Sequence, residues 1–310
     1  MYKDHRISVV VPAHNEQALI GKTLRTMPNF VDHIIVVDDC SSDDTCGAAQ
    51  AVGDPRVTVL RHDVNQGVGG AILSGHRHAL EIGGDINVVM AGDAQMDPDY
   101  LPSLLDPIVE DGYGFTKANR FFSMESFANM PKHRIFGNVV LSFMTKLASG
   151  YWHLFDPQNG YTAIRQDVLR RLRLDTIAHG YHFENDLLIN LCIIGVRARD
   201  VPIPAVYGTE VSGIKLHRVI PRLSALLFKG FWKRIWMKYV LWSFSPIALL
   251  LFTAILLILF GTGVGIFVLA NTLGTKTASA ATVMMSVGPL MTGIYMLIQA
   301  LVLDIQETPD

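Results

Sequence analysis

Two long apolar segments near the C-terminus constrain the fold of this 310-residue chain more than any other feature. Residues 244–270 and 280–303 contain no Asp, Glu, Lys or Arg, and the only charged residue between them is Lys276. A helix needs roughly 20 apolar residues to cross the hydrocarbon core of a bilayer. We therefore predict that both segments are membrane-spanning helices, joined by a short loop near Lys276 that faces outward.

The basic residues before the first apolar segment set the predicted orientation. Between residues 215 and 243, aromatic and aliphatic side chains are interleaved with cations: Lys215, Arg218, Arg222, Lys229, Lys233, Arg234 and Lys238. Lys- and Arg-rich flanks stay in the cytoplasm, and a basic amphipathic stretch is typical of a helix that lies in the headgroup region. An ordinary solvated helix with one core-facing side is the alternative for this stretch.

These features divide the chain into four predicted parts. We expect a cytoplasmic catalytic domain at 1–214, juxtamembrane amphipathic helices at 215–243, a two-helix transmembrane anchor at 244–304 and a cytoplasmic tail at 305–310. The apolar stretch at 7–11 is too short for the core of a signal peptide. We therefore expect the N-terminal domain to stay in the cytosol.

Composition excludes several classes of protein. Half of the residues are hydrophobic and 17% are charged, against roughly 25% charged in an ordinary soluble domain. The formal net charge of -2 argues against non-specific binding of nucleic acid. The cysteines, Cys40, Cys46 and Cys192, form no CxxC pair. A disulfide framework or a zinc cluster is therefore not expected, and a reducing compartment is the simplest interpretation.

The N-terminal two thirds of the chain have the pattern of an α/β domain. Short runs rich in β-branched residues occur at 7–11, 33–37, 57–60 and 86–90, and helical patterns lie between them near 16–27, 43–52, 69–82 and 100–110. This alternation predicts a mostly parallel sheet with helices on both faces. In such sheets, ligands bind at the carboxyl ends of the strands.

Polar motifs follow the predicted strands at the points where a ligand is expected. PAHNE at 12–16 ends the first strand, VVDDCSSDDT at 36–45 ends the second, and NQGVGGA at 65–71 precedes a helix. Glu16 and Asp39 can accept hydrogen bonds from a base or a ribose, and the glycines allow the backbone to come close to a ligand. Helix capping and simple turns are the structural alternatives for these motifs.

The segment VVMAGDAQMDP at 88–98 points to phosphate chemistry. A pyrophosphate leaving group needs a divalent cation to neutralise its growing charge. Mg²⁺ binds oxygen ligands, often one or two carboxylates together with phosphate oxygens. Asp93 and the amide oxygen of Gln95 supply such ligands at the end of one strand, so we predict a Mg²⁺ or Mn²⁺ site there. A loop that only caps the next helix is the alternative.

Taken in order, these four motifs resemble the family 2 glycosyltransferases with the GT-A (Rossmann-like) fold. The two apolar C-terminal segments narrow the resemblance to the polyprenyl phosphate sugar transferases, which include dolichyl-phosphate mannose synthase and the bacterial undecaprenyl-phosphate glucosyltransferases. The resemblance covers roughly residues 6–215 of the catalytic domain. It depends on the series of motifs, because no single motif is specific to the family.

The resemblance implies a role for individual residues. It implies that the nucleoside is bound by Pro12, Ala13, Glu16 and Asp39. Asp93 and Gln95 would bind the metal and the diphosphate, and Ser212 and Lys215 would close over the diphosphate. Around the reacting groups, Arg120 lies near the donor sugar or phosphate, Arg134 meets the acceptor phosphate, Asp156 lies beside the sugar, and Glu184 belongs to an acidic segment that faces the acceptor. Two positions depart from the family pattern: Ala91, where an aspartate is frequent, and His14, where an aromatic residue is frequent.

The implied reaction transfers a hexose-type sugar from a UDP- or GDP-linked donor to dolichyl or undecaprenyl phosphate. A lipid phosphate is already anionic near neutral pH, because its second pKa is about 6. It needs nearby cations, which Arg120, Arg134 and Lys215 provide, more than it needs a base. We therefore expect Asp156 and Glu184 to orient sugar hydroxyls, and direct attack by the phosphate to invert the anomeric carbon.

Two other functions stay open at this stage. A processive polysaccharide synthase would use the same core, but it usually has more membrane spans and a Gln-x-x-Arg-Trp motif, which this sequence lacks. A catalytically silent anchor that binds a nucleotide-sugar or another membrane protein is supported by Ala91 alone. The expected partners are the nucleotide-sugar, the polyprenyl phosphate, the bilayer and, through the two spans, further copies of this chain; no nucleic acid is expected.

Overall fold

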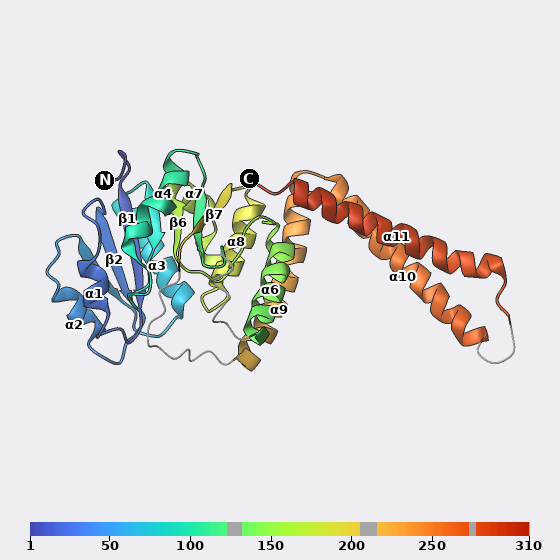
Figure 1. Ribbon diagram of the computed structural model, residues 1–310, viewed down its shortest axis with the longest axis horizontal. Helices are drawn as coiled ribbons and strands as arrows, with labels where there is room; N and C mark the ends of the chain where they lie inside the picture. Colours follow the sequence, from blue (N-terminus) through green and yellow to red (C-terminus); the bar gives the residue numbers. More distant parts are fainter. Residues whose placement is uncertain (123–131, 205–215, 273–276, 310) are drawn as a thin grey trace. The chain divides into compact units, whose positions relative to one another are not determined.

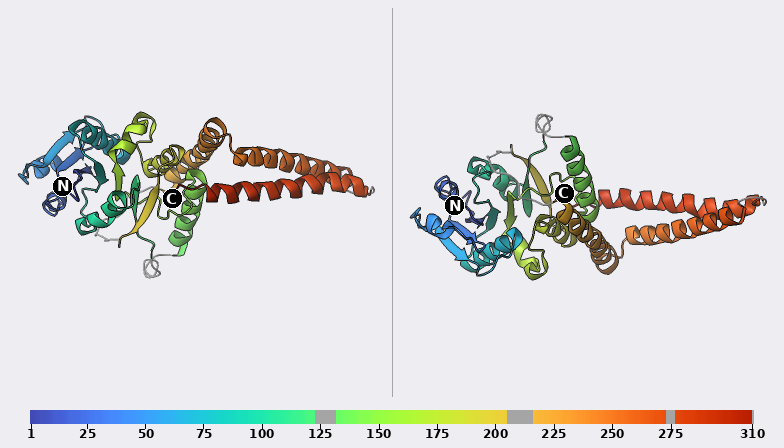
Figure 2. Two further views of the ribbon diagram at one scale, coloured as in Figure 1. Left: turned by 90° about the horizontal axis from the view of Figure 1, so that it is seen from above. Right: turned by 90° about the horizontal axis from the view of Figure 1, so that it is seen from below.

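The computed structural model describes residues 1–122, 132–204, 216–272 and 277–309. The chain forms two compact units (Figures 1 and 2). The first comprises Met1–Phe231 together with Pro309, and the second comprises Trp232–Thr308. The first unit holds the sheet and the candidate site, and the second holds the two apolar helices.

The first unit is built on a seven-stranded sheet with the order β3-β2-β1-β4-β6-β5-β7. The strands are β1 (Ile7–Ala13), β2 (His33–Asp38), β3 (Val57–Arg61), β4 (Ile86–Val89), β5 (Phe115–Asn119), β6 (Thr162–Arg165) and β7 (Ala198–Pro202). Strand β6 pairs antiparallel with both β4 and β5, and the other pairs are parallel. The prediction of a mostly parallel sheet is confirmed.

Helices cover both faces of this sheet, because successive side chains of a strand point to opposite faces. Val9 of β1 packs with α1 (Ile20–Arg25), α2 (Thr45–Gln50) and α4 (Leu101–Val109), which follows the short 3-10 helix η1 (Pro98–Tyr100). Val10 faces the other way, toward α3 (Val68–Ile82). The same face carries α7 (Gln166–Arg171) and α8 (Phe183–Ile193). The remaining elements of this unit are η2 (Leu174–Thr176), α6 (Lys132–Ser149) and most of α9 (Leu216–Arg234).

The first helix is shorter than the sequence predicts. The pattern indicates a helix over 16–27, but α1 begins only at Ile20. Asn15 has a φ of 60°, which is left-handed, and the backbone N–H of Glu16 donates to Thr45 Oγ1 at 2.9 Å. The backbone N–H of Asn15 also donates to Ser41 Oγ at 2.9 Å, so the turn after β1 is fastened to the loop after β2 and to the first residue of α2, and the regular helix starts after that turn.

The second unit contains a π-helix, η3 (Ile235–Trp242), and two long helices, α10 (Pro246–Thr272) and α11 (Ala280–Gln306). Both long helices are apolar enough to cross a membrane, and only 28% and 17% of their most apolar stretches are buried within the protein. They lie side by side in Figures 1 and 2. Small residues allow this close packing: a Cβ atom added at Gly261 would lie 2.7 Å from Ser286 O, and Ser286 Oγ donates to Gly261 O at 2.8 Å.

A buried ion pair ties the end of α11 to the start of η3. Arg234 Nη1 lies 2.5 Å from Asp304 Oδ1, Arg234 Nη2 lies 3.1 Å from Asp304 Oδ2, and the hydroxyl of Tyr239 donates to Asp304 Oδ1 at 2.5 Å. Arg234 is fully buried. The sequence places Arg234 among cations that face lipid headgroups, and this is wrong for Arg234 because its charge is neutralised inside the unit.

Candidate functional site

The candidate site lies at the carboxyl ends of β1, β2 and β4, where the sequence predicts a ligand. A cavity of about 330 Å³ lies there. It is lined by residues of the predicted motifs and by two residues that precede α8: Pro12, Ala13, His14, Glu16, Asp39, Asn65, Gly67, Val68, Ala71, Ala91, Gly92, Asp93, Gly180 and Tyr181. Five residues predicted to bind the donor therefore border one space. Their individual roles stay predictions.

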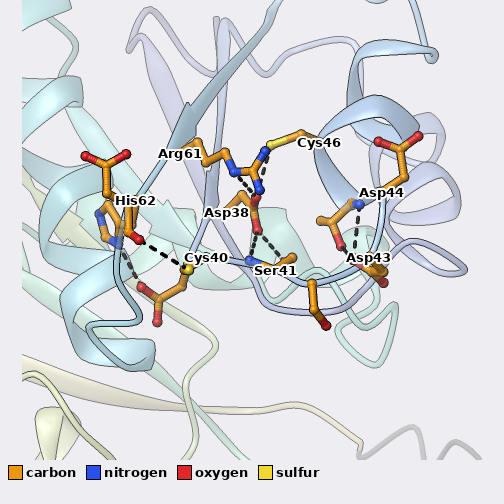
Figure 3. A network of polar contacts seen from close by, with 12 residues as sticks. Asp38, Cys40, Ser41, Asp43, Asp44, Cys46, Arg61 and His62 are labelled. Atoms are coloured by element: carbon orange, nitrogen blue, oxygen red, sulfur yellow. Dashed lines mark hydrogen bonds and ion pairs between the residues drawn. The ribbon is translucent and has the colours of Figure 1, made fainter.

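Asp38, the last residue of β2, fastens the loop that follows this strand. Ser41 N donates to Asp38 Oδ1 at 3.0 Å, Cys46 Sγ donates to Asp38 Oδ2 at 3.1 Å, and Arg61 Nε lies 3.5 Å from Oδ2 (Figure 3). Burial raises the pKa of Asp38, but hydrogen bonds from Ser41 and Cys46 and the charge of Arg61 outweigh it and hold the pKa below its usual value. Burial and the same carboxylate raise the pKa of the Cys46 thiol to about 11, so this cysteine stays protonated.

Asp39 shapes the cavity through the backbone of the glycine-rich turn. Its Oδ1 accepts from Gln66 N at 2.8 Å and its Oδ2 accepts from Gly67 N at 2.7 Å. His62 Nδ1 lies 2.8 Å from Oδ1. The carboxylate therefore holds the turn in place, in addition to bordering the cavity.

The glycines of this turn serve protein packing more than the sequence predicts. A Cβ atom at Gly69 would lie 2.6 Å from Phe183 Cβ and 2.7 Å from His179 O. Gly70 N donates to His179 O at 3.0 Å, and Gly67 has a φ of 83°. The close backbone approach is thus to residues 178–183, which place Tyr181 at the cavity, whereas the sequence pattern predicts approach to a ligand.

Asp93 borders a second, smaller cavity as well as the first. This cavity has a volume of about 90 Å³ and is lined by Asp93, Gln95, Met96, Asp97, Ala118, Arg120, Asn159, Tyr161, Ile203 and Pro204. Ala94 has a φ of 56°, and Asp93 Oδ1 accepts from Gln95 N at 3.0 Å. The tight turn after β4 therefore presents Asp93 to both cavities.

The donor atoms at this turn fit a divalent cation that also binds phosphate. Among the described residues, no group of three or more His, Cys, Asp and Glu side chains is arranged to hold a metal ion. Asp93 and Gln95 supply one carboxylate and one amide at the same turn. Mg²⁺ commonly binds one or two carboxylates and takes its other ligands from phosphates and water, so this set suits a metal that arrives with a diphosphate.

Arg120 is held by Asp156 at the edge of the smaller cavity. Arg120 Nε and Nη2 donate to the two carboxylate oxygens of Asp156 at 2.7 and 2.8 Å. Burial raises the pKa of Asp156, but hydrogen bonds and charge from Arg120 outweigh it and hold the pKa below its usual value. Asp156 therefore stays ionised and orients Arg120, and the sequence-based role beside the sugar stays a prediction.

A buried lysine supports the loop that carries Asp156. Lys117 is 1% exposed, and its Nζ lies 3.0 Å from Asp200 Oδ1 and donates to Asp156 O at 2.9 Å and to Phe155 O. Asp156 has a left-handed φ of 49°. The lysine thus satisfies carbonyl groups of a strained loop directly beneath the Arg120–Asp156 pair.

Glu184 lies in the first turn of α8. It lines an enclosed space of about 10 Å³ with Lys117 and Gly160, and a Cβ atom at Gly160 would lie 3.7 Å from Glu184 Oε1. Burial raises the pKa of Glu184 to about 7. A half-buried carboxyl that titrates near neutrality is typical of functional sites, and it can donate or accept a hydrogen bond from a sugar hydroxyl.

Glu184→Gln is expected to stabilise the protein more near pH 8 than near pH 5. The folded-state pKa of about 7 exceeds the unfolded value of 4.5, so the folded form retains a proton that the unfolded form releases. Wild-type stability is therefore lost as pH rises from about 4.5 to about 7, and glutamine removes this loss. Thermal unfolding across this range should give a Tm difference that grows with pH and then levels. Glu81→Gln on α3 is the exposed control, and a Glu184→Gln difference that is independent of pH would contradict the raised pKa.

The remaining predicted site residues cannot be placed at the cavities. The side chain of Arg134, on α6, lies outside the described residues, and so do Ser212 and Lys215. The structure adds Lys117 and His62, which the motifs did not indicate. It places Tyr181, the first residue of the segment 181–186 predicted to face the acceptor, at the larger cavity. Nothing in the local sequence FTKAN of β5 marks Lys117 as a buried residue.

Comparisons with known proteins agree with this fold. A family model described as glycosyl transferase family 2 matches residues 8–173. The chain is 31% identical over 224 residues to a UDP-N-acetylglucosamine–dolichyl-phosphate N-acetylglucosaminyltransferase of Methanococcus voltae. This alignment covers 67% of this chain and 88% of that protein. It is also 32% identical over 203 residues to an undecaprenyl-phosphate mannosyltransferase of Micrococcus luteus, in an alignment that covers 64% of this chain and 82% of that protein.

A solved structure supports the fold at lower identity. Glucosyl-3-phosphoglycerate synthase from Mycobacterium tuberculosis, in complex with Mn²⁺, UDP-glucose and phosphoglyceric acid, superposes with a TM-score of 0.56 at 22% identity. The match covers 74% of this chain and 80% of that one. At this identity the likeness concerns the fold.

Proposed function

The chain belongs to glycosyl transferase family 2, and from this we propose that it transfers a sugar from a nucleotide diphosphate sugar to a polyprenyl phosphate. The named relatives that act on dolichyl and undecaprenyl phosphates support this acceptor class. The observation that carries the proposal is the position of Asp93, which borders both cavities. A donor with its nucleoside in the larger cavity would place its diphosphate at Asp93 and its sugar toward Arg120.

In this arrangement each group of the donor meets side chains suited to it. Pro12, Ala13, Glu16 and Asp39 border the nucleoside space. Asp93 and Gln95 would hold Mg²⁺ or Mn²⁺ together with the diphosphate. When bound, the cation neutralises the charge that develops on the leaving nucleoside diphosphate.

The chain's own residues position the acceptor and the sugar. Arg120, fixed by two hydrogen bonds to Asp156, offers a guanidinium to an anionic oxygen at the smaller cavity. Arg134, Ser212 and Lys215 complete the proposed set of groups around the two phosphates. Glu184 orients the sugar hydroxyls, and the lipid phosphate attacks the anomeric carbon directly. The carbon–oxygen bond to the nucleoside diphosphate breaks as the new bond forms, which inverts the configuration.

The proposed setting is a membrane with the catalytic unit on the cytoplasmic side. The exposed apolar surfaces of α10 and α11 support membrane insertion, and the cations of 215–243 support a cytoplasmic location for the flanking residues. Two spans return the C-terminal tail to the same side. We further propose that copies of the chain associate through α10 and α11.

A silent anchor is the second candidate, and Ala91 is the observation that favours it. It predicts that nucleotide binds without turnover. The proposed enzyme predicts turnover that depends on a divalent cation.

Purified protein in detergent, incubated with polyprenyl phosphate and a panel of radiolabelled UDP- and GDP-sugars, tests the proposed reaction. Label should enter the organic phase from one donor, and only when Mg²⁺ or Mn²⁺ is present. Nucleotide binding with no transfer from any donor would support the silent anchor, and Ala91→Asp is then the first substitution that should restore transfer.

A further inference from the structure

A chain of hydrogen bonds links the cavity wall to the interior of α3 through a histidine that the function proposed above does not use. His62 Nδ1 lies 2.8 Å from Asp39 Oδ1, and His62 Nε2 lies 2.9 Å from Ser74 Oγ. The side chain of His62 is 10% exposed and that of Asp39 is 4% exposed. In Figure 3, His62 and Asp44 lie on opposite sides of Asp38, the last residue of β2.

The partners of this histidine determine which ring nitrogen carries the proton. Gln66 N and Gly67 N both donate to the carboxylate of Asp39, so its oxygens act as acceptors. His62 must therefore donate to Asp39 through Nδ1–H, and its Nε2 is paired with the hydroxyl of Ser74. The ring is thus held from both ends.

Three donors leave Asp39 with little remaining capacity. A carboxylate offers about four lone-pair sites, and among the described residues three are used, by Gln66 N, Gly67 N and His62 Nδ1. Asp39 also borders the larger cavity. One acceptor site is left for a hydroxyl or N–H group of a bound nucleoside, and its direction is set by the other three.

His62 would act on the ligand through Asp39 and not by direct contact. Among the residues that the structure describes, neither His62 nor Ser74 lines the larger cavity, whereas Asp39, Gly67 and Val68 do. His62 follows β3, Asp39 follows β2, and Ser74 belongs to α3. The histidine therefore joins three elements whose relative positions define one wall of the nucleoside space.

We propose that His62 is a positioning residue for the nucleoside: it fixes the carboxylate of Asp39 and, through Asp39, the turn at Gln66 and Gly67. This rests on the proposed function only in taking the cavity's ligand to be a nucleoside diphosphate. Loss of the histidine removes one of the three hydrogen bonds that fix the carboxylate and weakens donor binding, but it leaves the groups around the anomeric carbon in place.

A matched pair of substitutions separates the hydrogen bond from the packing of the ring. His62→Asn would place an amide N–H near the position of Nδ1, whereas leucine has the same branching and no donor. His62→Leu is expected to raise the Kd for UDP or GDP, and the KM for the donor sugar, about tenfold with kcat nearly unchanged, since a hydrogen bond to a charged group is lost. His62→Asn should restore most of the affinity, and Ser74→Ala should have an intermediate effect.

Calorimetric titration of each variant with UDP and with GDP gives the affinities, and thermal unfolding without ligand shows whether the fold is intact. His78→Leu and His78→Asn, on α3 and paired with Glu81, are controls expected to bind as the wild type does. Equal binding by His62→Leu and wild type, equal loss in the leucine and asparagine variants, or a fall in kcat alone would overturn the positioning role. A wild type that binds neither nucleotide would overturn it too.

Nucleotide titration also separates this inference from the proposed reaction. A wild type that binds nucleotide but transfers no sugar to polyprenyl phosphate contradicts the proposed acceptor and leaves the result for His62 intact. Normal transfer by the wild type with unchanged affinity in His62→Leu contradicts the positioning role and leaves the reaction intact.

Discussion

Asp93→Asn is expected to lower kcat/KM for sugar transfer by roughly a hundred- to a thousandfold, the usual effect of removing one electrostatic group that acts on developing charge. Asparagine keeps the shape of the side chain, and its amide oxygen can still accept from Gln95 N, as Asp93 Oδ1 does at 3.0 Å. The turn after β4 should therefore keep its conformation. The loss of activity in this variant would therefore report the removal of the negative charge that would hold the cation.

Metal titration of this variant distinguishes charge from conformation. The concentration of Mn²⁺ that gives half-maximal activity should rise in Asp93→Asn, while the Tm stays within a few degrees of wild type. Asp99→Asn is a matched control, because Asp99 is exposed and lies on η1 of the same segment. Near-normal activity in Asp93→Asn that persists in the presence of a chelator would contradict a metal role for this turn.

Lys117→Met is expected to lower the free energy of unfolding by about 3–5 kcal/mol, which is the typical result of removing one partner from a buried ion pair. Methionine fills a similar volume but cannot neutralise Asp200 or donate to the carbonyl groups of Phe155 and Asp156. Thermal or chemical unfolding in detergent measures the loss. Lys22→Met on α1, where the lysine is exposed, should have almost no effect.

The pH dependence of this variant provides a second check. Burial raises the pKa of Asp200 even with Lys117 beside it, so removal of the lysine should raise that pKa further. An acid whose folded-state pKa is raised costs stability above its unfolded pKa. The destabilisation by Lys117→Met should thus be larger near pH 8 than near pH 5, and Asp200→Asn should recover part of it in the double variant. A loss that is independent of pH would contradict the ion pair.

Sequence periodicity was sufficient to predict β1 to β4, because these strands are short, rich in β-branched residues and separated by helical patterns. It did not predict β5, β6 and β7, which complete the sheet. It also located the two apolar helices from their length alone. Periodicity misplaced the start of α1: Asn15 has a left-handed φ of 60°, the residues after it form turns, and the regular helix begins at Ile20. It also failed at Arg234, whose partner Asp304 lies 70 residues away.

The position of the candidate site was predictable for the residues that directly follow a strand. Asp93 and Gln95 belong to one motif, and Asp39 and Glu16 follow neighbouring strands, so the sheet brings them to one edge. The supporting contacts were not predictable. His62 meets Asp39 across 23 residues, and Lys117 meets the carbonyl group of Asp156 across 39, and no local pattern encodes such pairs.

The most direct test of the proposed reaction compares two lipids that differ only in the phosphate. Wild-type protein receives its labelled donor and the divalent cation, with either polyprenyl phosphate or the polyprenol of the same chain length, and the label in the organic phase is counted. We expect label only with the phosphate, attached through an inverted anomeric carbon. Equal labelling of the polyprenol, or label that accumulates in a water-soluble polymer, would contradict transfer to a polyprenyl phosphate.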